Sequence, residues 1–221
     1  MKRLIVLLIL MTMFYGLVAE TEKDTFRAAD TGLLLIPTAT TLPGGRYQLS
    51  TWWLVVYSLG YGLTDDLQIN GTTVFPFNKE ALDGLTLSGK YRFYKKGRHS
   101  AAAWLTTTPF LDLVSLGGVG SYHYKALRLH GGLGLGLDYG KDEQIGVFMG
   151  GFDVSMGTRR AFFTEFFAAD RTISDDLRYP ITLGYRHFGK DYSADLAMVR
   201  MAQVDKDQWL WLLILKGSFH F

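Results

Sequence analysis

Hydrophobic and polar residues alternate at successive positions along most of this chain. In 127–139 the odd positions carry Leu, Gly or Tyr, while the even ones carry glycines, Arg128, His130 and Asp138. The stretch 85–94 repeats the alternation. A period of two is that of a β-strand with one apolar and one polar face. The pattern therefore predicts an all-β chain whose strands contact lipid with one face and line a polar interior with the other.

The end of the chain is a strand of the same kind. In steps of two back from Phe221, an apolar face runs through Phe219 to Trp211, and the opposite face carries Lys216 and two further polar residues. Unpaired strand edges find no water in a bilayer, so such strands predict a closed membrane barrel. A terminal Phe on such a strand resembles the closing strand of bacterial outer-membrane barrels. The resemblance implies that Phe219 and Phe221 form a signal for the barrel assembly machinery.

The alternation also predicts where the strands lie. They are expected at 46–63, 67–76, 85–95, 101–109, 115–124, 127–138, 144–156, 160–169, 177–188, 192–201 and 209–221. Bacterial barrels have an even number of strands, so a transmembrane antiparallel barrel of about 12 is predicted, with 10 or 14 as alternatives. The missing strand is either 32–39 or a product of splitting 46–63, which exceeds the roughly ten residues of a spanning strand. We favour 32–39, although Pro37 would be awkward in a central ladder.

An even number of strands places both chain ends in the periplasm. Short connections at 64–66, 125–126, 157–158 and 189–190 would then be periplasmic turns. The longer segments 77–84, 139–143, 170–176 and 202–208 would lie outside the cell.

The N-terminus predicts export. Lys2 and Arg3 precede an apolar run, small residues follow near Val18 and Ala19, and a charged stretch begins at Glu20. This is the pattern of a cleaved signal peptide, here 1–19. The 15 residues of 4–18 are fewer than the roughly 20 that a transmembrane helix needs. Residues 20–221 are then a single outer-membrane barrel domain in contact with outer-membrane lipids.

Charge and cysteine content exclude several functions. Loss of Lys2 and Arg3 lowers the 23 basic residues to 21, equal to the 21 acidic ones. A formally neutral chain does not predict nucleic-acid binding. The absence of cysteine excludes disulfides and thiolate metal sites, and the five histidines are scattered. No metal or other cofactor is predicted.

Charged residues on the inward faces predict a lumen of mixed charge. They are Lys90, Arg92, Arg128, Glu165, Arg186, Asp195 and Lys216. The favoured interpretation is the lining of a narrow, porin-like channel for small polar or anionic solutes. The alternative is an occluded structural or partner-binding barrel, because a charge away from water needs a partner. Inward Phe163 and Phe167 beside Glu165 favour occlusion.

Hairpin pairing across the turn at 125–126 brings one possible catalytic group together. If Tyr124 pairs with Leu127, Ser121 faces His130, and the next strand brings Asp153 near. A Ser-His-Asp triad would suggest an outer-membrane hydrolase. Arg128 competes for the carboxylate, however, and no oxyanion donor is identified, so three polar residues on a polar wall are the better interpretation. No catalytic residue is assigned.

Two stretches carry a further resemblance. The segment 31–39, which contains Pro-Thr-Ala, and the stretch 57–69 resemble the opening of a widespread group of uncharacterised outer-membrane barrel proteins. Glu165, 184–188 and 192–196 are similar to later strands of that group. The resemblance covers most of the chain after the signal peptide and implies a barrel, with no activity or substrate attached.

Overall fold

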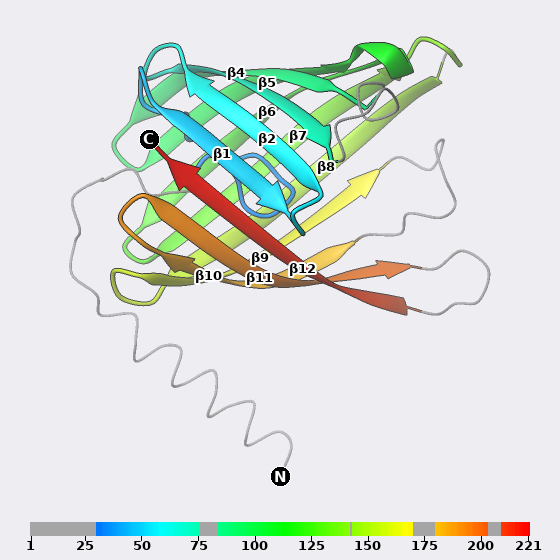
Figure 1. The fold of residues 1–221 in the computed structure, drawn as a ribbon. Helices are drawn as coiled ribbons and strands as arrows, with labels where there is room; N and C mark the ends of the chain where they lie inside the picture. Colours follow the sequence, from blue (N-terminus) through cyan, green and yellow to red (C-terminus); the bar gives the residue numbers. More distant parts are fainter. Residues whose placement is uncertain (1–29, 76–83, 142, 170–179, 203–208) are drawn as a thin grey trace.

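Twelve antiparallel strands close into one barrel, in which β1 pairs with β12 (Figure 1). The computed structural model describes residues 30–75, 84–141, 143–169, 180–202 and 209–221, so the predicted signal peptide lies outside it. The strands are β1 (Tyr47–Trp52), β2 (Val56–Gly62), β3 (Leu67–Val74), β4 (Thr86–Lys96), β5 (His99–Thr108), β6 (Leu113–Tyr124), β7 (Leu127–Asp138), β8 (Glu143–Ser155), β9 (Arg160–Ala169), β10 (Ile181–Phe188), β11 (Tyr192–Ala202) and β12 (Trp209–His220). A short 3-10 helix, η1 (Pro109–Leu111), lies between β5 and β6. The predicted twelve-stranded all-β barrel is confirmed.

Within the ranges given above, no helix is both long and apolar enough to span a bilayer.

The twelfth strand comes from dividing 46–63, so the preference for 32–39 is wrong. β1 and β2 pair with each other, with Trp52 opposite Val56. Trp53 and Leu54 form the turn with φ of 51° and 58°, and the Val55 N–H donates to the Trp52 carbonyl at 3.0 Å. Hairpin turns of this hand are usually built from Asn and Gly. Because two large apolar residues occupy the left-handed positions, the sequence carries no turn signal there.

The last strand closes the barrel as predicted. Leu49 lies opposite Phe219, and the backbones of Tyr47 and Phe221 exchange hydrogen bonds of 2.9 and 3.2 Å. The two rings also stack, with centroids 5.8 Å apart. The end of the barrel that holds Phe221 is called the C-terminal rim below, and the other end the opposite rim.

Strand residues alternate between the barrel's two faces. In β10, Thr182, Gly184 and Arg186 are buried inside, whereas Ile181 and Leu183 are exposed outside. This alternation follows from the pleat of the strand, which points successive side chains to opposite faces. The predicted separation of apolar outer and polar inner faces is confirmed for this strand.

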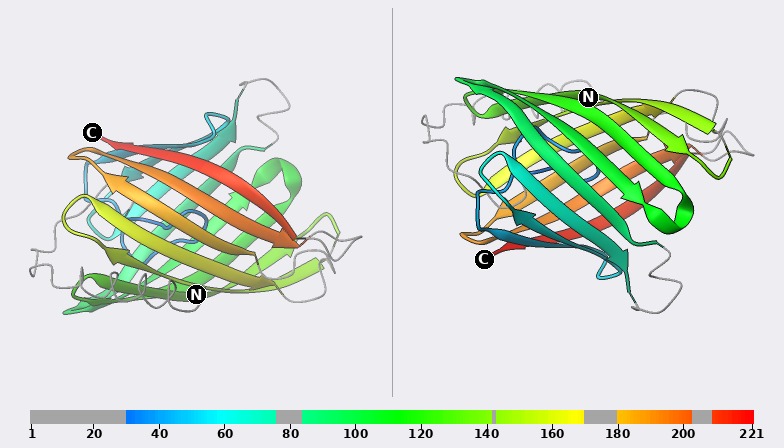
Figure 2. Two further views of the ribbon diagram at one scale, coloured as in Figure 1. Left: turned by 90° about the horizontal axis from the view of Figure 1, so that it is seen from below. Right: turned by 90° about the horizontal axis from the view of Figure 1, so that it is seen from above.

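Residues 30–43, named the inner segment here, fold inside the barrel. The dark-blue trace of this segment lies within the ring of strands in both views of Figure 2. Leu33, Leu34 and Leu42 are at most 2% exposed. The segment forms no strand; its only ladder contact among the described residues is an isolated bridge between Gly32 and Pro37. It is therefore held by contacts other than strand pairing.

Candidate functional site

The inward charges predicted from the sequence surround the inner segment. Lys90, Glu165, Arg186, Asp195 and Lys216 are at most 7% exposed. Arg128 is nearly buried, and its side chain reaches the segment at Asp30. Arg92 is separate from this group and forms an ion pair of 2.7 Å with Asp66 at the C-terminal rim. Apart from Arg92, the candidate residues thus form one connected site in the middle of the lumen.

Glu165 on β9 holds the turn of the inner segment by its backbone. Its carboxylate accepts hydrogen bonds from the N–H groups of Leu35, at 2.9 Å, and Ile36, at 3.2 Å. The side chain is 1% exposed. A buried carboxylate needs such donors because it has lost its water. Glu165 therefore orients this turn.

Two cations, one on β10 and one on β12, bind a carbonyl of the same turn. Lys216 Nζ donates to the Leu33 carbonyl at 2.7 Å, and an Arg186 Nη donates to the same oxygen at 3.2 Å. The Arg186 guanidinium also forms two bonds of 2.7 Å to the Asp195 carboxylate. This two-pronged geometry is the strong form of an Arg–carboxylate pair. The predicted cluster of Arg186, Asp195 and Lys216 thus binds the inner segment.

The other end of the segment is held by two further cations. Lys90 Nζ donates to the carbonyls of Thr31, at 2.8 Å, and Thr38, at 3.1 Å, and so bridges both arms of the turn. Arg128 bonds Asp30 at 2.5 Å and Asp153 at 2.8 Å. These bonds hold the first described residues of the segment and join its two arms.

Ser121, His130 and Asp153 form a hydrogen-bonded chain, as the hairpin pairing predicts. Ser121 Oγ lies 2.8 Å from His130 Nδ1, and His130 Nε2 lies 3.1 Å from Asp153 Oδ2. Ser121 pairs with His130 in the β6–β7 ladder, confirming the predicted register. The serine oxygen accepts the N–H of Ala39 at 3.0 Å, and all three residues are at most 7% exposed. In this arrangement the serine anchors the inner segment.

Several anchoring residues carry no sequence signal for this role. Gln68 Oε1 accepts the N–H of Leu42 at 2.8 Å, and Trp52 Nε1 donates to the Leu34 carbonyl at 3.3 Å. Just after the segment, the Asp65 carboxylate accepts the N–H of Gly44 at 2.9 Å. The alternation of inward and outward side chains would place Gln68 and Trp52 in the lumen. It does not reveal that these side chains bind backbone groups of the segment. These residues were missed because the segment itself was predicted to be a strand.

Apolar contacts complete the site. Leu33, Leu34 and Ile36 form a buried cluster with wall residues that include Met149 and Phe163. Phe167 packs against this cluster, so the expected contribution of inward phenylalanines to occlusion is seen. Among the residues described, no three His, Asp or Glu side chains gather in a way that could hold a metal ion.

Known structures share this architecture. A KdgM porin aligns with a TM-score of 0.53 at 10% identity, covering 80% of this chain and 98% of that one. KdgM porin in complex with disordered oligogalacturonate aligns with a TM-score of 0.55 at 9% identity, over the same shares. Comparison with protein-family models gives no match, and comparison with curated proteins gives none either. The relation to the uncharacterised group stays a prediction. The chain has the fold of an outer-membrane porin, a closed twelve-stranded antiparallel barrel.

Proposed function

We propose that the protein is a narrow outer-membrane channel for small polar solutes, closed by its inner segment, with both chain ends in the periplasm. The porin fold supports a channel. The inner segment fills the lumen without joining the strand ladder, which supports a plug that can be removed. The hydrogen bonds that Glu165, Arg186 and Lys216 form with residues 32–36 of the segment end on backbone groups. The segment therefore could leave the lumen without breaking any strand ladder.

The charges around the segment indicate which solutes the opened lumen would favour. Four cations, Lys90, Arg128, Arg186 and Lys216, lie near three wall acids, Asp153, Glu165 and Asp195. Asp30 of the segment supplies a fourth acid by pairing with Arg128. Displacement of the segment removes that acid and leaves an excess of positive charge. A small anion is then the preferred solute, since rings of cations select anions.

Lys90→Met tests both parts of the proposal. In planar bilayers with a salt gradient, we expect rare openings for the wild type and more frequent ones for Lys90→Met, because two bonds to the segment are lost. The open state of the variant should also be less anion-selective, as judged by its reversal potential. Lys96→Met, at an exposed strand end, is the matched control and should behave as wild type. If none of the three proteins conducts and each is folded, the channel is wrong.

An occluded barrel that presents its loops or turns to envelope partners is the second candidate. The observation that favours it is the apolar cluster around Leu33, Leu34 and Ile36, which holds the segment independently of the charges. Under this function, no variant that loosens the polar contacts would produce an open pore.

No catalysis is proposed for the hydrogen-bonded chain through Ser121. We expect purified protein to hydrolyse p-nitrophenyl butyrate no faster than Ser121→Ala does, because the serine oxygen is occupied by the Ala39 N–H and lies under the segment. The assay is colourimetric, with His130→Ala as a second comparison. Ester turnover that is present in the wild type and absent in both variants would restore the hydrolase interpretation.

A further inference from the structure

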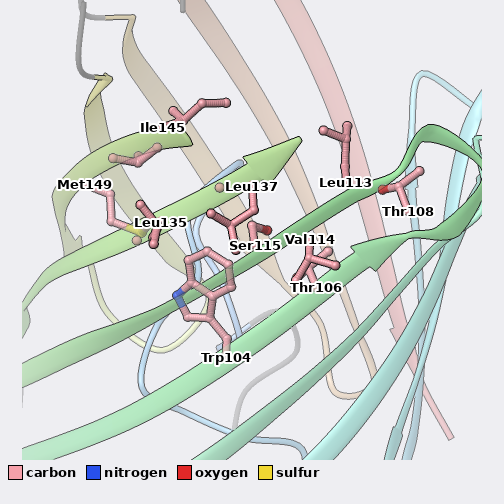
Figure 3. A pocket seen from close by; sticks show the side chains of 13 residues that line it. Trp104, Thr106, Thr108, Leu113, Val114, Ser115, Leu135, Leu137, Ile145 and Met149 are labelled. Carbon is pink, nitrogen blue, oxygen red and sulfur yellow. The ribbon is translucent and has the colours of Figure 1, made fainter. Parts of the chain in front are cut away.

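An apolar cavity of about 310 Å³ lies in the half of the lumen toward the opposite rim, near Thr108, Leu113 and Ile145. Figure 3 shows the side chains that line it. Its wall is formed by β5 to β8, with Trp104, Ile145 and Val147 among the apolar side chains. Thr106 and Ser115 contribute hydroxyls, and none of the described residues that line it carries a charge. All the buried charges described above belong to the site around the inner segment, so the lumen has two chemically distinct parts.

The inner segment provides the apolar floor next to this cavity. Met149 lines the cavity and also belongs to the buried cluster that contains Leu33 and Leu34. Trp104 and Val147, which line the cavity as well, pack against the same cluster. The apolar surface therefore continues from the cavity wall onto the segment. A charged solute would lose its hydration here without gaining a partner.

Two glycines keep the cavity open by letting the Trp104 ring lie against the wall. A Cβ at Gly117 would come within 2.6 Å of the indole, and one at Gly134 within 2.9 Å. Carbon atoms cannot approach so closely, so any larger residue would push the indole into the cavity. The combination of a large ring and glycines under it preserves the empty volume.

The indole also offers an unused hydrogen bond. Trp104 Nε1 is buried and has no acceptor among the described residues. A buried donor without an acceptor costs about 1–3 kcal/mol, which a bound molecule whose oxygen reached the indole would recover. That molecule needs an apolar body to match the wall and an oxygen to accept from the indole.

The barrel wall is also shorter on the side of β12. The β1–β2 hairpin stops where the Trp53 N–H donates to the Leu215 carbonyl at 2.9 Å and the Trp53 indole to the Leu213 carbonyl at 2.8 Å. Beyond this point toward the opposite rim, β12 pairs only with β11 among the described strands. Among the described strands, the ladder at this rim is thus shorter beside β12 than in β5 to β8, which line the cavity.

From these features we propose that the cavity binds a medium-length acyl chain whose head-group oxygen accepts the hydrogen bond of Trp104. A volume of about 310 Å³ lies at the small end of ligand pockets, which span about 300–1,000 Å³, so a single chain is the fitting occupant. Apolar burial supplies the affinity, and the indole positions the head. This site goes beyond the proposed channel and exists with the inner segment in place.

Saturable binding of 11-(dansylamino)undecanoic acid to the protein in phospholipid vesicles tests the site. The dansyl fluorescence, excited directly, is compared with that of protein-free vesicles. A Cβ at Gly136 would sit 3.6 Å from Ile145 in ordinary contact, so Gly136→Leu should fit the strand and fill the cavity. Gly131→Leu, on the outer face of the same strand with open space around it, is the matched control.

We expect wild type and Gly131→Leu to bind alike, and Gly136→Leu to bind at least tenfold more weakly. Trp104→Phe should weaken binding about tenfold, as the loss of one hydrogen bond implies. If Gly136→Leu does not fold, Ser115→Leu fills the same space and takes its place. No saturable signal from folded wild type, or equal binding by the cavity-filled and control variants, would overturn the site. Because the readout is fluorescence, a non-conducting protein does not affect the result.

Discussion

Deletion of residues 30–43 should convert a mostly closed barrel into a steadily open pore. The segment occupies the lumen with Leu33 and Leu34 almost fully buried, and it contributes no strand to the ladder. Bonds to charged groups are each worth about 1.5–3 kcal/mol, and the segment has several. A net loss of only about 2.7 kcal/mol shifts a two-state equilibrium roughly hundredfold, so the open probability should rise by at least that factor.

Single-channel recording in planar bilayers measures this change, and heat-dependent migration in SDS gels shows that the shortened chain still folds. Glu165→Gln is an intermediate variant, because the amide oxygen keeps one acceptor for the N–H groups of Leu35 and Ile36 while the charge is lost. Its open probability should fall between those of wild type and deletion. A folded deletion variant that does not conduct would show that the wall side chains alone fill the lumen, in favour of the occluded barrel.

The strand framework could be predicted from sequence because it depends on the local alternation of inward and outward side chains. The register of Tyr124 with Leu127 follows from a two-residue turn, and from it follow the positions of Ser121 and His130. The pairing of Arg186 with Asp195 follows likewise from the turn near Gly189. Wherever a tight turn joins two alternating strands, one pairing fixes all the others.

The inner segment could not be predicted because its contacts have no periodicity. Its partners Lys90, Glu165 and Lys216 are separated from the segment atoms they bind by 52 to 183 residues. They also bind backbone groups, which every residue type possesses, so the identity of the segment residues carries little information. Short apolar runs fit a strand or an irregular buried segment equally well. The resemblance to an uncharacterised group includes both Glu165 and residues 31–39. These are the two sides of the contact between Glu165 and the inner segment.

Arg186→Met should be the most destabilising single substitution in the lumen wall. It leaves the Asp195 carboxylate, 3% exposed, without its two bonds of 2.7 Å. Removing one partner of a buried ion pair costs about 3–5 kcal/mol, because the remaining charge is uncompensated. Lys216 lies opposite Asp195 in the ladder and offers some compensation, so we expect the lower end of this range. Urea unfolding in phospholipid vesicles, followed by tryptophan fluorescence, measures the loss.

The double variant Arg186→Met/Asp195→Leu separates the ion pair from the anchoring of the segment. With both charges gone, most of the lost stability should return, since two well-packed apolar groups can replace a buried pair at little cost. The bond from Arg186 to the Leu33 carbonyl stays absent, so the double variant should open more often than wild type despite its recovered stability. If instead the double variant is as unstable as Arg186→Met, the guanidinium stabilises the barrel chiefly through the inner segment. The same pair of substitutions in the chain lacking 30–43 would then have no effect on unfolding.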